Sequence, residues 1–174
     1  MEYDRTGFEA FVAERYATMV RAAVLLGLRH ADAEDAVQEA FARCFAAWPR
    51  VRAADDPQAY AFRVLLNVVR RAGRRRWTGE LPHAEMSADP MAGGDPATTV
   101  PQAQSVRAAL ARLNRAQRQV LVLRYFVDLT EVQTARVLGI APGTVKSRAA
   151  RAMALLARDP DLVEHQVHAR EEGP

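Results

Sequence analysis

The sequence predicts an all-α fold in which two small helical domains are joined by a flexible linker, the second domain being a helix-turn-helix. Apolar residues recur at helical spacing through residues 6–77 and again through 106–156. Between them, residues 78–101 are rich in proline, glycine, alanine and acidic residues and show no helical period. Residues 128–151, DLTEVQTARVLGIAPGTVKSRAAR, have the spacing of two short helices around a tight turn. The second domain is comparable to winged-helix domains in topology only, by analogy.

The 174 residues divide on this pattern into a first domain at 1–77, an acidic linker at 78–101, a second domain at 102–158 and an acidic tail at 159–174. A hydrophobic content of 49% and a mean hydropathy of -0.20 indicate a soluble globular protein. No transmembrane segment or signal peptide is predicted, so we expect a cytoplasmic protein. The single cysteine, Cys44, excludes an internal disulfide, and the scattered histidines give no metal site. We expect no cofactor.

The distribution of charge says more than the net value of +3. Residues 63–76 carry 6 basic and no acidic side chains, and residues 107–151 carry 9 basic against 2 acidic. Residues 1–62 carry 7 basic and 10 acidic side chains, and residues 78–101 carry 4 acidic and none basic. Two basic blocks separated by an acidic linker suit a protein that contacts a polyanion at two places.

The first half of the chain predicts three helices. Residues 6–26 form a long amphipathic helix whose expected role is packing, and a second helix runs from an Asp32 N-cap to Trp48. One side of this second helix is apolar, and the opposite side presents Asp35, Gln38, Glu39 and Ala42. We assign Trp48 to the core. The alternative is that its ring lies beside the following loop, which could form a pocket for a flipped nucleic-acid base. Residues 49–56 are predicted to be a loop.

A third helix should begin at the cap and first-turn pair Asp56 and Pro57 and continue to about Trp77. Six uncompensated cations within 14 residues would repel one another, so we favour nucleic acid over a merely solvated helix end. One face combines aromatic, amide and guanidinium groups: Tyr60, Arg63, Asn67, Arg70, Arg71, Arg74 and Arg75.

The second domain begins with a helix through Val106 and Leu113, followed by a capping box of Asn114 and Gln117. The next helix carries Val120, Leu121, Leu123, Tyr125 and Phe126 on its apolar positions. Arg118 and Arg124 on this helix are candidates for phosphate contacts, although simple surface solvation would also account for them.

In the helix-turn-helix, Thr130 and Gln133 predict a second capping box, Gly139 a left-handed stop and Pro142 the first position of the last helix. Val132, Ala135, Val137 and Leu138 are predicted to form the apolar side of the first of the two helices, and Val145, Ala149, Ala152 and Leu156 that of the second. The outer side of the last helix then presents groups suited to phosphates and guanine edges: Thr144, Lys146, Ser147, Arg148 and Arg151.

Three segments, AEDAVQEAFARCF, LNRAQRQVLVLRYFVDLT and GIAPGTVKSRAARA, resemble the sigma-70 family of RNA polymerase sigma factors, in its extracytoplasmic-function class. Ala141 stands where that family often has a capping serine, and TEVQTA replaces a more acidic stretch. The first departure weakens the cap of the recognition helix, and both leave the promoter sequence open.

The resemblance implies a non-enzymatic function: binding core RNA polymerase and starting transcription at promoters by recognising -35 and -10 elements and melting the -10 region. It implies that Asp35, Gln38 and Glu39 dock on the clamp coiled coil, with a further contact on the flap of the large subunits. The helix from Tyr60 to Arg75 would bind the -10 element, and Arg118, Arg124, Thr144, Lys146, Ser147, Arg148 and Arg151 the -35 element. Whether an anti-sigma partner exists is left open, and no membrane contact is expected.

Two alternatives come from other classes of protein. A helix-turn-helix regulator would bind duplex operators as a dimer without polymerase, and it would leave the Asp35, Gln38 and Glu39 face without a role. A helical adaptor would bind acidic proteins through its basic faces and show no sequence preference on DNA. The acidic tail is expected to fray, or alternatively to cover the DNA-binding surface.

Overall fold

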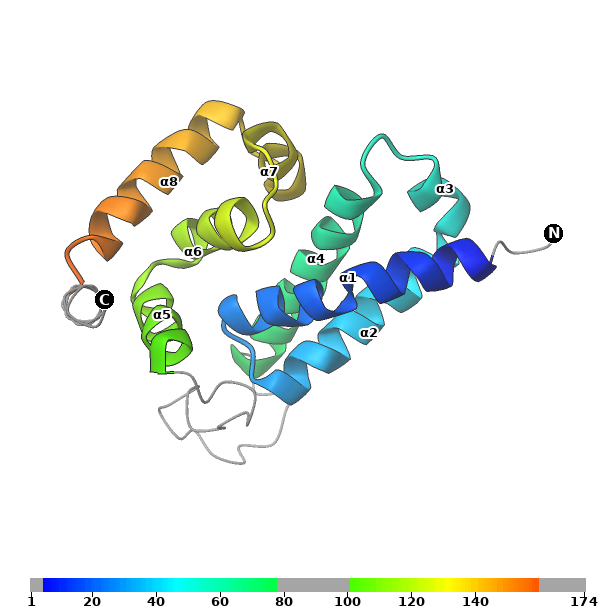
Figure 1. Cartoon of the computed structure of the whole chain (residues 1–174), viewed down its shortest axis with the longest axis horizontal. Helices are drawn as coiled ribbons and strands as arrows, with labels where there is room; N and C mark the ends of the chain where they lie inside the picture. Colours follow the sequence, from blue (N-terminus) through cyan, green and yellow to red (C-terminus); the bar gives the residue numbers. More distant parts are fainter. Residues whose placement is uncertain (1–4, 78–100, 160–174) are drawn as a thin grey trace, which may run out of the picture. The chain divides into compact units, whose positions relative to one another are not determined.

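Two groups of helices make up the chain (Figure 1). The computed structural model describes the backbone of residues 5–77 and 101–159, and the side chains of residues 6–72 and 104–159. Helices α1 to α4 belong to the first unit, and α5, α6, a π-helical turn (η2), α8 and the larger part of α7 belong to the second. These ranges contain no strand, so the predicted all-α architecture with two helical domains is confirmed. The predicted linker and the tail from residue 160 lie outside them.

The first unit consists of α1 (Arg5–Leu25), α2 (His30–Ala46), the short α3 (Trp48–Arg52) and α4 (Pro57–Trp77). Helix α2 packs against both α1 and α4, and α3 packs against α4. Their inner faces bury a continuous apolar core that includes Met19, Val37, Val51, Phe62, Leu65 and Leu66. The predicted apolar sides of α2 and α4 face this core, whereas apolar residues are spread around α1.

Aromatic rings close one end of this core. The Trp48 ring lies 5.2 Å from the Phe8 ring and 5.3 Å from the Phe11 ring, and Phe8 lies 4.9 Å from Phe45. Trp48 is only 5% exposed, which supports its assignment to the core. Phe45, predicted to be on the apolar side of α2, is 38% exposed at the edge of this cluster.

Two boundaries in the first unit differ from the prediction. Helix α2 begins at His30 with Arg29 as its N-cap, because the Asp32 carboxylate is paired with the Arg29 guanidinium (Nε to Oδ2, 2.9 Å) and does not cap the helix. Residues 48–52, predicted to be mostly loop, form α3. Proline in the first turn of α3 and full burial of Val51 stabilise this extra turn, which local sequence patterns do not indicate.

Cys44 is fully buried between the helices of the first unit, as predicted for a core residue. Burial raises the pKa of the Cys44 thiol to about 11. The thiol is therefore protonated at neutral pH, and it has the character of a packing group rather than a nucleophile.

The second unit consists of α5 (Pro101–Arg112), α6 (Arg115–Leu121), η2 (Val122–Phe126), α7 (Glu131–Leu138) and α8 (Pro142–Leu156). Helix α6 packs against α8. The residues buried in this unit include Leu110, Val120, Leu121, Leu123, Leu129 and Val145.

The predicted helix ends of this unit are confirmed. The Asn114 side chain accepts a hydrogen bond from the Gln117 backbone amide (2.9 Å), and the Thr130 side chain accepts one from the Gln133 backbone amide (3.2 Å). In each box the glutamine side-chain oxygen accepts in turn from the backbone amide of the cap residue. Gly139 ends α7 in the left-handed region, with φ of 68°. The helix-turn-helix is therefore set by local chemistry.

Three apolar side chains of this unit are more exposed than predicted. Val132 is 52% exposed, and the inward position on α7 belongs to Thr134, which is fully buried. Tyr125 and Phe126 are 57% and 47% exposed. In η2 the Val127 amide bonds to the Val122 carbonyl, five residues back, and this wider turn rotates the following side chains away from the α-helical positions.

Replacement of Gly139 by alanine is expected to destabilise the second unit by about 1–2 kcal/mol, the usual penalty for a Cβ in the left-handed region. A Cβ at Gly139 would meet no atom within 4 Å, so the cost is conformational and not steric. Hydrogen exchange of the α7 and α8 amides measures the change. The matched control is Gly143→Ala, also free of clashes, which should stabilise α8 slightly. Equal protection in wild type and Gly139→Ala would contradict the prediction.

Candidate nucleic-acid interface

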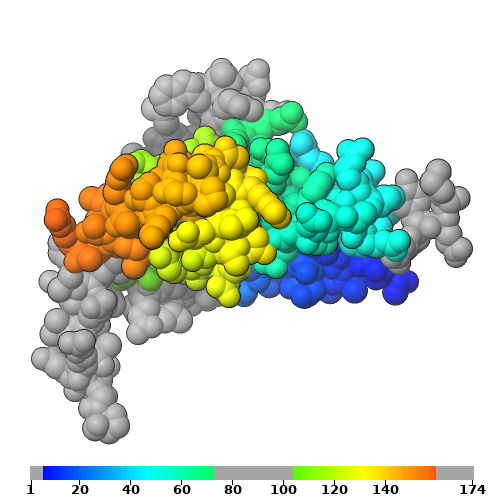
Figure 2. All heavy atoms as spheres, turned by 90° about the horizontal axis from the view of Figure 1, so that it is seen from above, coloured from blue at the N-terminus to red at the C-terminus, as the bar shows by residue number. Residues whose placement is uncertain are grey.

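The buried side of α8 packs against the rest of the second unit and thereby fixes the direction of its outer side. Val145, Ala149 and Ala152 are buried, and Leu156 is half-buried, as predicted. The predicted contact residues lie elsewhere on the helix: Lys146 and Arg151 are exposed, and Thr144, Ser147 and Arg148 are half-buried. Figure 2 shows the α7 and α8 side chains, coloured yellow to orange, together on one face of the second unit. The helix therefore presents cations and hydroxyl groups over one side.

The N-terminus of α8 lacks a side-chain cap, as the alanine at position 141 predicted. Pro142 occupies the first helical position, and the Thr144 and Val145 amides bond to the Ala141 carbonyl. The positive end of the helix dipole is not neutralised by a capping oxygen, which favours an anion such as phosphate near this end.

Arg118 on α6 has a structural role in the observed fold. Its Nε donates to the Leu110 carbonyl at 2.8 Å, and its Nη2 donates to the carbonyls of Ala111 at 2.7 Å and Leu113 at 3.3 Å. These carbonyls lie at and just beyond the end of α5, and that of Leu110 also accepts from the Leu113 amide, so Arg118 caps this helix end and fixes the α5–α6 corner. Burial lowers the pKa of the Arg118 guanidinium.

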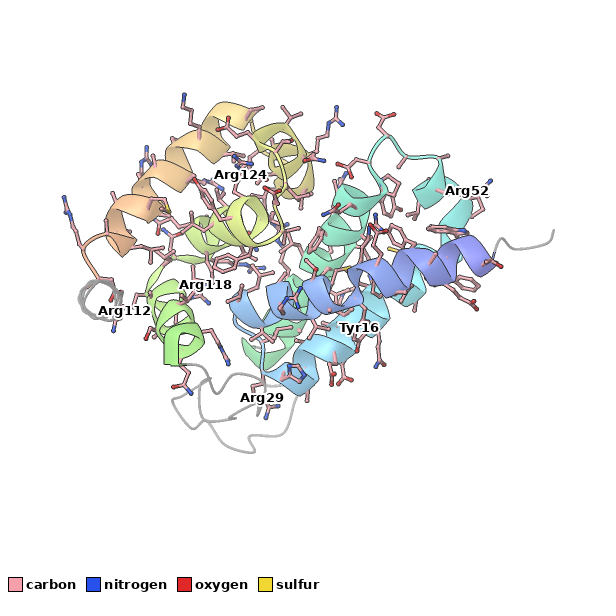
Figure 3. All side chains as sticks on the ribbon, in the orientation of Figure 1. Tyr16, Arg29, Arg52, Arg112, Arg118 and Arg124 are labelled. Carbon is pink, nitrogen blue, oxygen red and sulfur yellow. The ribbon has the colours of Figure 1, made fainter. Side chains whose placement is uncertain are left out.

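Arg124 in η2 holds the connection that leads into the helix-turn-helix. Its Nη1 donates to the Leu129 carbonyl, and its guanidinium lies 5.9 Å from the centre of the Tyr125 ring (Figure 3). Arg118 and Arg124 are thus both engaged with backbone carbonyls. Any phosphate contact would use their remaining N–H groups, so these two contacts stay predictions.

Helix α4 carries the predicted second basic surface. Its buried side includes Ala61, Leu65 and Val68, as expected from the periodicity. The residues predicted to contact nucleic acid, called the α4 stripe below, lie away from the buried side. Arg63, Asn67 and Arg71 are exposed, and Tyr60 and Arg70 are half-buried. Arg74 and Arg75 belong to the last turns of α4, and their side chains lie outside the described residues.

The predicted acidic and amide face of α2 is on the surface. Asp35, Gln38 and Glu39 are all exposed, while Val37 and Phe41 are buried in the core. Glu39 forms an ion pair of 2.5 Å with Arg43, one turn along the same helix. The Glu39 carboxylate is thus partly neutralised by Arg43, and Asp35 and Gln38 are the other two polar side chains exposed on this face.

The described parts of the chain give no sign of another kind of site. Among the residues described, no three His, Cys, Asp or Glu side chains are grouped so that they could hold a metal ion. No helix in the same ranges has the length and apolar character needed to cross a membrane.

A long-range ion pair was missed by sequence reasoning. Arg112, the last residue of α5, donates through Nη1 to the Asp159 carboxylate beyond the end of α8. The two residues are 47 positions apart, and Asp159 falls in the segment predicted to be a frayed acidic tail. A pattern of local spacing cannot indicate such a contact.

Two family models match the chain, one in each unit. Residues 12–78 match the model of sigma-70 region 2, and residues 103–156 match that of sigma-70 region 4. The RNA polymerase sigma-E factor of Streptomyces coelicolor is 34% identical over 163 residues, covering 88% of this chain and 89% of that protein. The ECF RNA polymerase sigma factor SigM of Mycobacterium tuberculosis is 32% identical over 155 residues, with 89% and 78% coverage.

Two solved structures have a similar fold. CnrH, in a complex with the cytosolic domain of CnrY, has a TM-score of 0.66 and 26% identity, covering 88% of this chain and 87% of that one. The sigma factor RpoE of Bartonella quintana, in a complex with the anti-sigma factor NepR, has a TM-score of 0.65 and 22% identity, with 86% and 94% coverage. The second likeness supports the fold alone.

Proposed function

This chain belongs to the sigma-70 family of RNA polymerase sigma factors, in its extracytoplasmic-function class, and we propose that its α2, α4 and α8 surfaces divide the work of transcription initiation. The protein binds core RNA polymerase and directs initiation at promoters, recognising -35 and -10 elements and melting the -10 region. Sigma factors are initiation factors, and bond chemistry belongs to the polymerase.

The α2 face is proposed to dock on the clamp coiled coil of the polymerase. Asp35, Gln38 and Glu39 are exposed on one side of a helix whose other side is buried in the core, so a partner meets a rigid surface. Carboxylate and amide groups on a rigid helix suit a basic or amide-rich partner helix. A second contact, between the second unit and the flap, is proposed from the family resemblance.

The α4 stripe is proposed to bind and open the -10 element. Opening DNA without ATP requires that unstacked bases of one strand be held more favourably than the duplex holds them. Tyr60 offers a ring for stacking, Asn67 an amide for base edges, and Arg63 a phosphate contact. Further cations continue along the same helix: Arg70, Arg71, Arg74 and Arg75. Residues 50–56, partly in α3, are a candidate pocket for a flipped base, and their substitution should change -10 preference.

Helix α8 is proposed to enter the major groove of the -35 element. Arg148 and Arg151 suit guanine edges or phosphates, and Lys146 a phosphate. Thr144 and Ser147 can bond to bases or phosphates from the same end of the helix. The uncapped N-terminus of α8 adds a favourable dipole for a nearby phosphate.

The observation that carries this proposal is the presence, in one chain, of an exposed acidic and amide face on α2 together with basic helix faces in two separate units. A regulator that binds operators without polymerase would use the α8 face alone. It would give no role to α2 or to the α4 stripe, and it is not favoured.

We also infer a regulatory protein partner and a cellular location. CnrH is bound to the cytosolic domain of CnrY, and an anti-sigma factor of comparable kind is a candidate partner here. Core polymerase and the chromosome define the cytoplasm as the expected place of action.

The proposal is tested by run-off transcription with purified core RNA polymerase and a library of promoter fragments. Wild type should start transcription at specific sites with both elements. Arg148→Ala/Arg151→Ala should lower the preference for a matched over a scrambled -35 element about thirtyfold or more, since each of the two base contacts is worth about 1–3 kcal/mol. Initiation on a pre-melted template should be unaffected. Specific DNA binding without initiation at any promoter would overturn the proposal in favour of a regulator.

A further inference from the structure

The ion pair between Arg112 and Asp159 differs from other ion pairs of the structure in its span. Arg29 with Asp32 and Glu39 with Arg43 both lie within about one helical turn. Arg112 and Asp159 join the end of α5 to the end of α8, so this pair closes almost the whole second unit into a loop. Figure 3 labels Arg112 on α5.

The backbone after α8 is folded so that the carboxylate turns inward. The Ala157, Arg158 and Asp159 amides bond back to carbonyls of the last turns, the last of these to Leu156 at 3.0 Å. The Asp159 side chain is only 6% exposed, whereas that of Arg112 is 53% exposed. A buried carboxylate is costly unless it is paired, and Arg112 supplies one such pairing at this end of the chain.

Apolar packing holds most of α8 but little of its last turn. Val145, Ala149 and Ala152 anchor the first two-thirds of the helix. Beyond them Met153 is 47% exposed and Leu155 50% exposed, and Leu156 is half-buried. The ion pair therefore supplies a tie where the apolar contacts thin out.

We propose that the Arg112–Asp159 pair is a latch that positions the recognition helix for the -35 element. This inference rests on the proposed function of α8. A helix of 15 residues is about 22 Å long and behaves as a rod, so the pair at its C-terminal end adds a second attachment to the apolar one and limits small rotations of the whole helix. Side chains that recognise a ligand must be held to within about 0.5 Å, and a loose second attachment lowers selectivity before it lowers folding. Arg112 and Asp159 act here as positioning residues without touching DNA.

The test uses the full-length chain with core polymerase in run-off transcription. The quantity measured is the ratio of product from a matched -35 template to product from a scrambled -35 template, both with the same -10 element. Asp159→Asn keeps the shape of the side chain and removes its charge. Asp161→Asn makes the same charge change in the acidic tail two positions further on and serves as the matched control. A pre-melted template, which needs no -35 contact, measures folding and polymerase binding.

For Asp159→Asn the ratio should fall about tenfold, the order of one lost base contact, while output on the pre-melted template stays at the wild-type level. Asp161→Asn should keep the wild-type ratio, and the charge exchange Arg112→Asp/Asp159→Arg should restore at least part of it. An unchanged ratio in Asp159→Asn overturns the latch, and so does an equal loss on the pre-melted template. Absence of specific initiation by wild type would instead count against the proposed function itself.

Discussion

Asp35→Ala/Gln38→Ala is expected to lower promoter-specific transcription about a thousandfold, because anchor residues at the centre of an interface are each worth about 2 kcal/mol or more. Both side chains are exposed on α2, so the core of the first unit does not depend on them. Alanine is also a better helix former than aspartate or glutamine, and α2 should remain folded. The loss should therefore appear in polymerase binding and not in helix content.

The measurement is the affinity of a fluorescently labelled chain for core polymerase, followed by run-off transcription with the same preparation. Glu14→Ala removes an exposed carboxylate from α1, in the same unit, and should leave both quantities near the wild-type values. If the double variant bound core polymerase as tightly as wild type, α2 would not be the docking surface. The regulator alternative, which assigns this face no role, would then regain support.

Arg118→Met is expected to destabilise the second unit by about 3 kcal/mol, since three carbonyls at the end of α5 would lose a charged donor, two of them at partly buried contacts. Methionine matches the length of the arginine stem but donates no hydrogen bond. Arg118→Lys keeps the charge, yet one ammonium group cannot span the three carbonyls as the guanidinium does, so it should recover only part of the stability. Hydrogen exchange of the α5, α6 and α8 amides measures the loss in this unit.

The salt dependence of promoter binding separates this structural role from a phosphate contact. Removing one phosphate contact makes the plot of log binding constant against log salt concentration less steep by about 0.9. Loss of a helix cap leaves this steepness unchanged. We expect an unchanged slope for Arg118→Met, which removes the charge. For stability the control is Arg136→Met, an exposed arginine on α7, which should lie within about 0.5 kcal/mol of wild type. Full stability of Arg118→Met together with a reduced slope would show that Arg118 serves DNA and not the fold.

Helix ends were predictable because each depends on a few neighbouring residues. Asp56 accepts from the Ala59 amide at 2.9 Å ahead of Pro57, as the sequence predicted, and the boxes at Asn114 and Thr130 form with the expected partners. These bonds span three residues, so the local sequence contains both groups that make them. The same reasoning placed the inner face of α8.

Errors occurred where a distant part of the chain decided between local options. Trp48 and Val51 bury themselves against other helices, and this burial converts a predicted loop into α3. At Asp32, a carboxylate with the character of a cap is paired with Arg29, and the helix starts earlier. Val132 and Thr134 exchange the expected burial because tertiary packing, and not side-chain polarity, orients the short α7.

The predicted contact surfaces divide in the same way. Exposure of Asp35, Gln38 and Arg63 follows from helical periodicity alone, because residues opposite a buried stripe must face outward. Periodicity cannot tell whether an arginine on a helix surface is used by the protein itself. Arg118 and Arg124 were expected to contact phosphates, and the fold engages both with carbonyls from other segments.

The amino-acid sequence by itself determined the all-α class, the helix-turn-helix with its caps and left-handed turn, the two basic blocks and the sigma-factor family. All of these depend on neighbouring residues or on motifs within one segment. Tertiary structure alone decided the existence of α3, the carbonyl cap provided by Arg118 and the pair between Arg112 and Asp159. The physical reason is that a buried charge or a helix-end carbonyl bonds to a group that the fold places beside it. For residues 47 positions apart, such as Arg112 and Asp159, local sequence patterns do not indicate that they are neighbours.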